Sequence, residues 1–248
     1  MRGSNPALND SFEKVIDGDG VYNDIMTLEG TVSKSMFLIA LLIGAGIVGW
    51  KVSSLSSYAP HMQTILIGSG ILAFITAMIT IFKKSMAPTT APAYAILEGI
   101  SLGIVSRLYE ASYSGIVLQA IFLTVAVFLA LLLCYKSGYI KPTENFRLAV
   151  ISATVGIFFV YLISFAGRFI GFTIPYLHDS GPIGIGISIV IVAVAALNLV
   201  LDFDFIEKGS DSGRLPAYME WYGAFGLLIT LVWLYIEILR LLAKLRDE

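Results

Sequence analysis

Three carboxylates lie within one short stretch of the chain, "LVLDFDFIEKG" at residues 199–209. Asp202, Asp204 and Glu207 follow a long apolar run, although only 14% of all residues are charged. Carboxylates in such a place are able to bind a cation or exchange a proton. The simpler alternative is a helix end that passes into a solvated loop. Acidic groups at a helix C-terminus oppose the helix dipole, which favours a site with compensating charge over a bare loop.

Asp202 is the preferred site residue of this stretch. Asn198 lies four residues earlier on the same helical face, whereas Asp204 is about 200° further around a continuing helix. We therefore expect only one of the two aspartates to face the protein interior, and Asp202 is the deeper one. Asp204 and Glu207 are expected at the level of the lipid headgroups. The basic residues that could compensate them on the same side are Lys83, Lys84, Lys208 and Arg214.

Two further carboxylates fall inside apolar stretches. Glu98 lies in "YAILEGISLGIVSRLY", with Tyr94 and Ser101 near it on the helical face. It is either a proton or cation site, or a neutral residue that joins two helices by hydrogen bonding. Glu237 lies in "WLYIEILRLL" three residues before Arg240, so we expect an ion pair within the helix.

The elements that hold these carboxylates are predicted to be membrane-spanning helices. The chain of 248 residues is 57% hydrophobic, with a mean hydropathy of +0.83. Apolar blocks of about twenty residues can cross a bilayer as helices, which satisfy their own backbone hydrogen bonds. Seven blocks occur, at residues 36–50, 62–82, 94–109, 115–135, 148–167, 183–201 and 221–242. The third is the least regular because it contains Glu98. An all-α, polytopic membrane protein with a seven-helix bundle is predicted.

The chain divides into a polar tail and a membrane domain. Residues 1–33 are polar and acidic and are predicted to form a cytoplasmic N-terminal tail, and residues 34–246 the transmembrane domain. Lys and Arg near the predicted helix ends are more numerous on the N-terminal side, which indicates that this side is cytoplasmic. Seven spans then put the C-terminus on the other side, and the basic residues of the C-terminal tail count against that placement.

Several functional classes find no support in the sequence. The net charge of −2 gives no basic surface for nucleic acid. There is a single cysteine, Cys134, and His61 and His178 are too far apart in sequence to suggest a zinc site. We therefore expect no enzymatic activity and no cofactor. An intramembrane hydrolase is the weakest alternative, and Asp202 with Glu98 is the one acid pair it could use.

Several segments resemble the Bax-inhibitor-like family of membrane proteins. "LNLVLDFDFIEKG" fits the ending of the family's sixth helix, with Asp202 at its key aspartate. "LEGISLG" at residues 97–103 is similar to the third-helix signature, and "ITLVWLYIEILRLLAKL" to the seventh helix. The acidic "SNP" tail and "EWYGAFGLL" resemble a bacterial branch. The similarity extends from about residue 34 to residue 246.

The resemblance implies a bundle around a central enclosed helix and a calcium-leak or cation-channel activity that depends on pH. In that pattern, two aspartates of the sixth and seventh helices share a proton and hold the pathway shut. Asp202 matches the first aspartate, but Thr230 stands where the second would be. Because threonine does not ionise, Asp202 is expected to pair with a lysine or to hydrogen-bond with Thr230. The resemblance implies a basic partner from the end of the second helix, which is Lys83 or Lys84.

Two functions from different classes follow. The first is a passive, pH-modulated leak for Ca²⁺ or protons in the cytoplasmic membrane, with Asp202 as the gate and Glu98 along the path. The alternative is a non-conducting regulator that binds other membrane proteins, such as a protease or a secretion component. The absence of the second aspartate favours the alternative, and the resemblance favours the leak.

Overall fold

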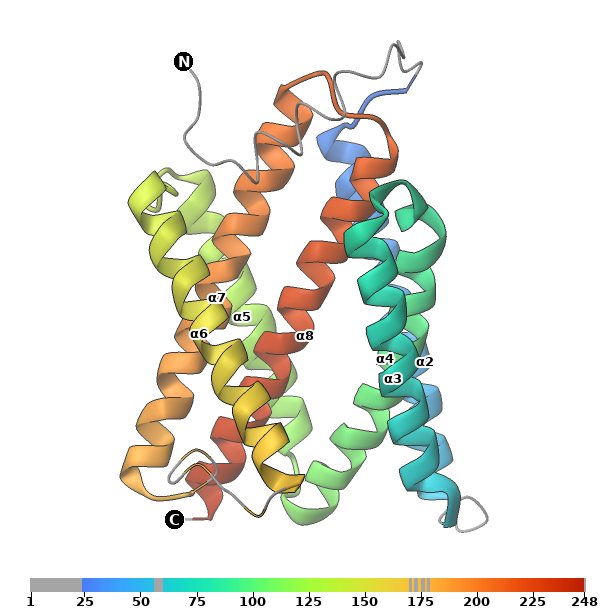
Figure 1. Ribbon diagram of the computed structural model, residues 1–248, viewed down its shortest axis with the longest axis vertical. Coiled ribbons are helices and arrows are strands. Elements are labelled where there is room, and N and C mark those ends of the chain that lie inside the picture. The colour runs from blue at the N-terminus through green and yellow to red at the C-terminus, as the bar shows by residue number, and fades with distance from the viewer. Residues whose placement is uncertain are drawn as a thin grey trace.

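The structure is a computed structural model that describes residues 24–55, 60–169, 171, 174, 177 and 179–247. This part of the chain consists of long helices and one short 3₁₀ helix. They are α2 (Leu28–Ser54), α3 (Met62–Phe82), η2 (Lys84–Met86), α4 (Ala87–Ser112), α5 (Ile116–Lys136), α6 (Glu144–Phe169), α7 (Pro182–Asp211) and α8 (Tyr218–Arg246). Successive long helices run in opposite directions, so the described chain begins at one end of the bundle and ends at the other (Figure 1).

Six helices in the described ranges are long and apolar enough to cross a membrane. They are α2, α3, α5, α6, α7 and α8. The prediction of an all-α, polytopic membrane protein is confirmed at this level. The remaining long helix, α4, corresponds to the irregular third block, and it packs between α2 and α3 on one side and α8 on another.

Helix α8 is the most buried of the six. In its most apolar segment, 50% of α8 is buried, compared with 33% or less in the corresponding segments of the other five helices. It packs against α2, α4, α5 and α7. Figure 1 shows α8 between α2, α3 and α4 on one side and α5, α6 and α7 on the other. This position explains why α8 presents polar residues to several neighbours.

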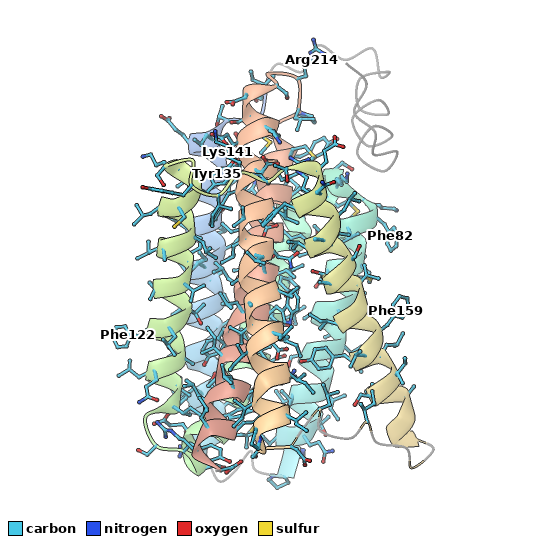
Figure 2. All side chains as sticks on the ribbon, turned by 90° about the vertical axis from the view of Figure 1, so that its left-hand side faces the viewer. Phe82, Phe122, Tyr135, Lys141, Phe159 and Arg214 are labelled. Atoms are coloured by element: carbon cyan, nitrogen blue, oxygen red, sulfur yellow. The ribbon has the colours of Figure 1, made fainter. Side chains whose placement is uncertain are left out.

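The outer surface of the bundle is apolar. Phe82, Phe122 and Phe159 belong to three different helices and point away from the bundle (Figure 2). Their exposed fractions are 81%, 65% and 53%. Large exposed apolar surface is typical of a protein face that meets another apolar phase, which for these helices is lipid.

Helix α2 begins earlier than the apolar block predicts. Its first residue, Leu28, lies within the predicted tail of residues 1–33, of which residues 1–23 lie outside the described part. The Thr27 side chain accepts from Gly30 N over 3.0 Å, and the Glu220 carboxylate accepts from Thr27 N over 2.8 Å. Glu220 also pairs with Lys34. The start of α2 is thus stabilised by a residue of α8, which a local sequence pattern does not reveal.

The contact between α2 and α4 depends on glycine. A Cβ atom at Gly99 or Gly103 would overlap the backbone carbonyl of Leu42 or Gly46 across the interface. Small residues allow such close backbone approach in membrane helices. The two helices are therefore held together along their length.

Candidate functional site

The second half of α7 and the first half of α8 border a pocket of about 490 Å³. Asp202 lines it from α7, Thr230 from α8, and Lys84 from η2. A Cβ atom at Gly226, one turn before Thr230, would lie 3.8 Å from Oδ1 of Asp202, so the carboxyl group meets α8 at this level. In the sequence, only the alignment implied by the family resemblance placed Asp202 and Thr230 together. In the structure they line the same pocket.

The polar groups of this pocket are incompletely paired. Oδ2 of Asp202 is buried and has no hydrogen-bond partner among the described residues. The Thr230 hydroxyl donates to the Gly226 carbonyl over 3.2 Å, and a threonine has one hydroxyl proton to donate. Toward Asp202 it then offers a lone pair, which suits a protonated carboxyl better than an ionised one. Because an unpaired buried carboxylate is costly, the charge state of Asp202 is coupled to the local packing.

Lys84 is the basic residue of the pocket. Its Nζ lies 5.1 Å from the centre of the Tyr222 ring, a cation–π contact. Burial lowers the pKa of the Lys84 ammonium group. Lys84 and Asp202 line the same pocket without an ion pair between them within the described ranges. Lys83, the other candidate partner, is exposed and does not line the pocket.

Asp204 is buried and Asp202 is partly buried, which corrects the expectations that only one aspartate faces the interior and that Asp202 is the deeper one. Asp204 is 5% exposed and forms ion pairs with Arg147 of α6 and, over 2.8 Å, with Lys208. The first expectation was wrong because α7 packs against both α6 and α8, so opposite faces of the helix are covered. Glu207 is exposed as expected, and it accepts a hydrogen bond from the Tyr135 hydroxyl.

The whole of "LVLDFDFIEKG" is helical, since α7 continues to Asp211. The two aspartates therefore remain on different faces, one toward α8 and one toward α6. Figure 2 shows Tyr135, Lys141 and Arg214 toward the same end of the bundle. At this end of the bundle, Arg147 and Lys208 pair with Asp204. These cations offset the acidic groups near the negative end of the α7 dipole.

A family model described as Bax inhibitor 1 like matches residues 5–247, which is almost the whole chain. The chain belongs to this family. The curated proteins and the solved structures compared with the chain gave no match. Membership of the Bax inhibitor 1 like family confirms the resemblance carried by the segments around Asp202 and in the third and seventh predicted helices.

In this Bax inhibitor 1 like protein, Glu98 lies apart from the Asp202 pocket. It is not among the pocket-lining residues, and it has no hydrogen bond or ion pair in the part of the chain that the structure describes. Ser101, an expected partner of Glu98, instead pairs with Ser69 of α3 over 2.8 Å. The acid pair that an intramembrane hydrolase would need, Asp202 with Glu98, is therefore not brought into one pocket.

The segment "GISLG" at residues 99–103 has the GxSxG spacing of many hydrolase nucleophiles. That motif acts on a sharp turn between a strand and a helix, where the serine is exposed. Here Ser101 lies inside α4, is 8% exposed and bonds to Ser69. The glycines serve the α2–α4 contact, and the segment is structural.

A second polar cluster lies at the other end of α8. Glu237 is 2% exposed and forms the expected ion pair with Arg240 over 3.0 Å. Its carboxylate also accepts from the Tyr161 hydroxyl of α6 over 2.9 Å and from Trp233 Nε1 over 3.2 Å. Nearby, Lys244 donates to two backbone carbonyls, and the group borders a cavity of about 240 Å³. This network joins α6 to α8.

Sequence reasoning missed the residues that complete these clusters, namely Arg147, Tyr161 and Tyr222. Arg147 lies one residue before the fifth apolar block. In the sequence, a basic residue at this position indicates only which side of the membrane the helix end faces. Tyr161 is a hydroxyl group inside an apolar block, which is a hint of an interhelical hydrogen bond. No group of three or more metal-ligating side chains occurs in the described ranges. The polar side chains that line the Asp202 pocket are thus one carboxyl group, the hydroxyl groups of Tyr222 and Thr230, and the amine of Lys84.

Proposed function

We propose that this Bax inhibitor 1 like protein is a passive cation leak whose opening depends on the protonation of Asp202. The observation that carries the proposal is the buried, unpartnered Oδ2 of Asp202 beside a pocket that also contains Thr230 and Lys84. When the Asp202 carboxyl group gains or loses its proton, its interactions with Thr230 and Lys84 in the pocket change. Its oxygen atoms suit Ca²⁺ or protons as the conducted ions.

The proposed architecture has seven spans, with α4 as the additional span and α8 as the enclosed central helix. The alternation of helix directions and the burial of α8 support it. The N-terminal side, including the tail of residues 1–33, is proposed to be cytoplasmic, in the inner membrane of a bacterial cell. The Asp202 pocket then lies toward the cytoplasmic half of the bundle, and the Glu237 cluster toward the outer half.

The proposed gate uses one titratable carboxyl group rather than two. When protonated, Asp202 donates to the Thr230 hydroxyl and keeps α7 against α8. When ionised, it loses this donor role and leaves a buried charge that is stabilised by water, by Lys84 or by a passing cation. Opening in this scheme comes from hydration of the pocket, because no second carboxylate lines it to repel the first.

The test is calcium flux into dye-loaded liposomes that contain the purified protein, measured between about pH 5 and pH 8. Flux is expected to rise with pH in the wild type. In Asp202→Asn, a neutral side chain of the same shape, flux is expected to be low at every pH. Glu207→Gln, which changes an exposed acid of the same helix, is the matched control and should behave like the wild type.

Glu98→Gln tests the proposed place of Glu98 on the path. An altered flux would extend the path to α4, and an unaltered flux would limit it to the α7–α8 pocket. If Asp202→Asn retains the flux and pH profile of the wild type, the gate proposal is wrong.

The alternative is a non-conducting regulator that binds other membrane proteins. Thr230 favours it, because the pocket lacks the second ionisable group of the family pattern. Absence of flux from folded protein at every pH would support this alternative. Retention of a defined membrane-protein partner by Asp202→Asn would then separate binding from the carboxyl group.

A further inference from the structure

An apolar cleft lies in the side of the described bundle, separate from the Asp202 pocket. Its volume is about 690 Å³, within the range of small-molecule sites. Ile43 and Ile47 of α2 form one wall, and Ile121 and Val125 of α5 form the other. Residues of α4 and α8 form its floor.

The cleft results from how the helices pair. Helix α2 is held closely on α4 through glycine contacts such as Gly103 against Gly46. Helix α5 packs instead on α7 and α8. The space between these two groups opens toward the surface that meets lipid, where Ile121 and Val125 are 45% and 48% exposed.

The depth of the cleft matches one leaflet of a bilayer. Along α2 it extends from Ile39 to Lys51, and along α5 from Val117 to Leu129. Each segment covers about 18 Å of helix at 1.5 Å per residue, compared with a hydrocarbon thickness of about 30 Å. Because Lys51 lies near the end of α2 and Val117 near the start of α5, the cleft begins at a membrane surface and ends near mid-membrane.

The surface end of the cleft is positively charged. Lys51 lines it, next to Trp50. The Arg107 guanidinium lies 5.7 Å from the centre of the Trp50 ring and donates to Ser54 over 3.3 Å. Neither Lys51 nor Arg107 forms an ion pair with any residue that the structure describes.

The Glu110 carboxylate, three residues after Arg107, does not pair with these cations. The Glu110 carboxylate accepts from Gly115 N over 2.6 Å and from Val117 N over 3.1 Å, at the start of α5. It is thus engaged with a helix N-terminus. The mouth of the cleft is left with two basic groups available to an anion.

We propose that the cleft holds an acyl chain of an anionic phospholipid, whose phosphate group lies against Lys51 and Arg107. A cleft of one leaflet's depth fits a lipid chain, whereas a spanning helix of a partner needs about twenty residues and the full membrane thickness. The uncompensated cations select an anionic headgroup over a zwitterionic one. Trp50 at the mouth is a residue type enriched at the membrane surface. The proposal is independent of whether the chain conducts ions.

Trp50 provides a direct readout of occupancy. The wild-type protein is placed in phosphatidylcholine bilayers with a small fraction of lipid brominated on its acyl chains, which quenches nearby tryptophan fluorescence. The same measurement on Trp50→Phe is subtracted, so that only Trp50 is observed. Brominated phosphatidylglycerol is expected to quench at about tenfold lower mole fraction than brominated phosphatidylcholine, since each basic residue favours anionic lipid.

Lys51→Gln combined with Arg107→Gln is expected to remove the difference between the two lipids. Equal quenching of the wild type by both lipids, in proportion to their mole fraction, would overturn the proposal.

A steric variant tests the cleft itself. Val125→Phe fills it and is expected to abolish saturable quenching of Trp50. Val155→Phe of α6 is the matched control, because Val155 is 46% exposed and does not line the cleft. Circular dichroism and size-exclusion chromatography verify that both variants are folded.

The steric variant also distinguishes a lipid from a second protein chain. If Val125→Phe dissociates a dimer of the wild type while leaving lipid quenching unchanged, the cleft is a protein interface and the lipid proposal is wrong. Identical quenching in both valine variants would likewise exclude a chain within the cleft.

Discussion

Asp202 of α7 and Thr230 of α8 border the same pocket, and Oδ2 of Asp202 is left without a partner among the described residues. Asp204, two residues later, belongs to a different cluster with Arg147 and Lys208. The carboxylates of one short stretch thus have separate surroundings. Asp202 is able to change its hydrogen bonding when it gains or loses a proton, whereas Asp204 is held by ion pairs with two cations.

Thr230→Asp is expected to move the rise of the calcium flux to higher pH than in the wild type. It places a second carboxyl group beside Asp202, and two adjacent carboxylates repel each other, so the pair keeps a shared proton to higher pH. The measurement is the liposome flux assay at a series of pH values. Thr230→Val, which removes the hydroxyl group without adding charge, is the control and should not move the rise to higher pH. An unchanged profile in Thr230→Asp would contradict a gate at this contact.

Asp204→Asn is expected to lower the free energy of unfolding by about 2 kcal/mol, since it removes the counter-charge of a partly buried arginine. The side chain of Asp204 is 7% exposed, and that of Arg147 is 26% exposed. The measurement is thermal unfolding of the purified protein in detergent. Glu207→Gln, at an exposed position nearby, is expected to change stability by much less. Equal losses in the two variants would show that the Arg147 ion pair does not stabilise the fold.

Glu237 and Arg240 are expected to be energetically coupled by about 1–3 kcal/mol, as residues in one buried network usually are. Glu237→Gln, Arg240→Gln and the double variant form a mutant cycle, measured by unfolding in a denaturing detergent. Each single variant leaves a charged group of the Tyr161 network without its counter-charge, whereas the double variant leaves none. Strict additivity of the two single changes would mean that the ion pair is not a stabilising interaction.

Lys84 is expected to make the protein more stable as the pH rises toward the alkaline range. Burial lowers the pKa of Lys84, so between the folded and unfolded pKa values the unfolded chain binds more protons. Stability therefore rises with pH through that interval. The measurement is the thermal midpoint from neutral to alkaline pH, taken as the difference between the wild type and Lys84→Met.

Lys83→Met is the matched control, because Lys83 is exposed. Its difference from the wild type should not change with pH. A flat difference for Lys84→Met as well would show that the Lys84 ammonium group is solvated in the folded protein.

Features that depend on neighbouring residues could be predicted from the sequence. The bounds of α3, residues 62–82, agree with the apolar block, because the bilayer selects helices by length and apolar composition. The Glu237–Arg240 ion pair was also predictable, since a spacing of three residues brings side chains together on any helix. The family membership was recognisable from the segments around Asp202.

Features that depend on distant residues required the tertiary structure. The start of α2 at Leu28 depends on Glu220, and the burial of Asp204 depends on Arg147, 57 residues earlier. The choice of Lys84 over Lys83 depends on the conformation of η2, which places one of two adjacent lysines at the pocket. The sequence by itself determined which segments are apolar enough to be helices in a membrane. Only the tertiary structure decided which polar side chains meet, because helix packing joins faces that no local spacing relates.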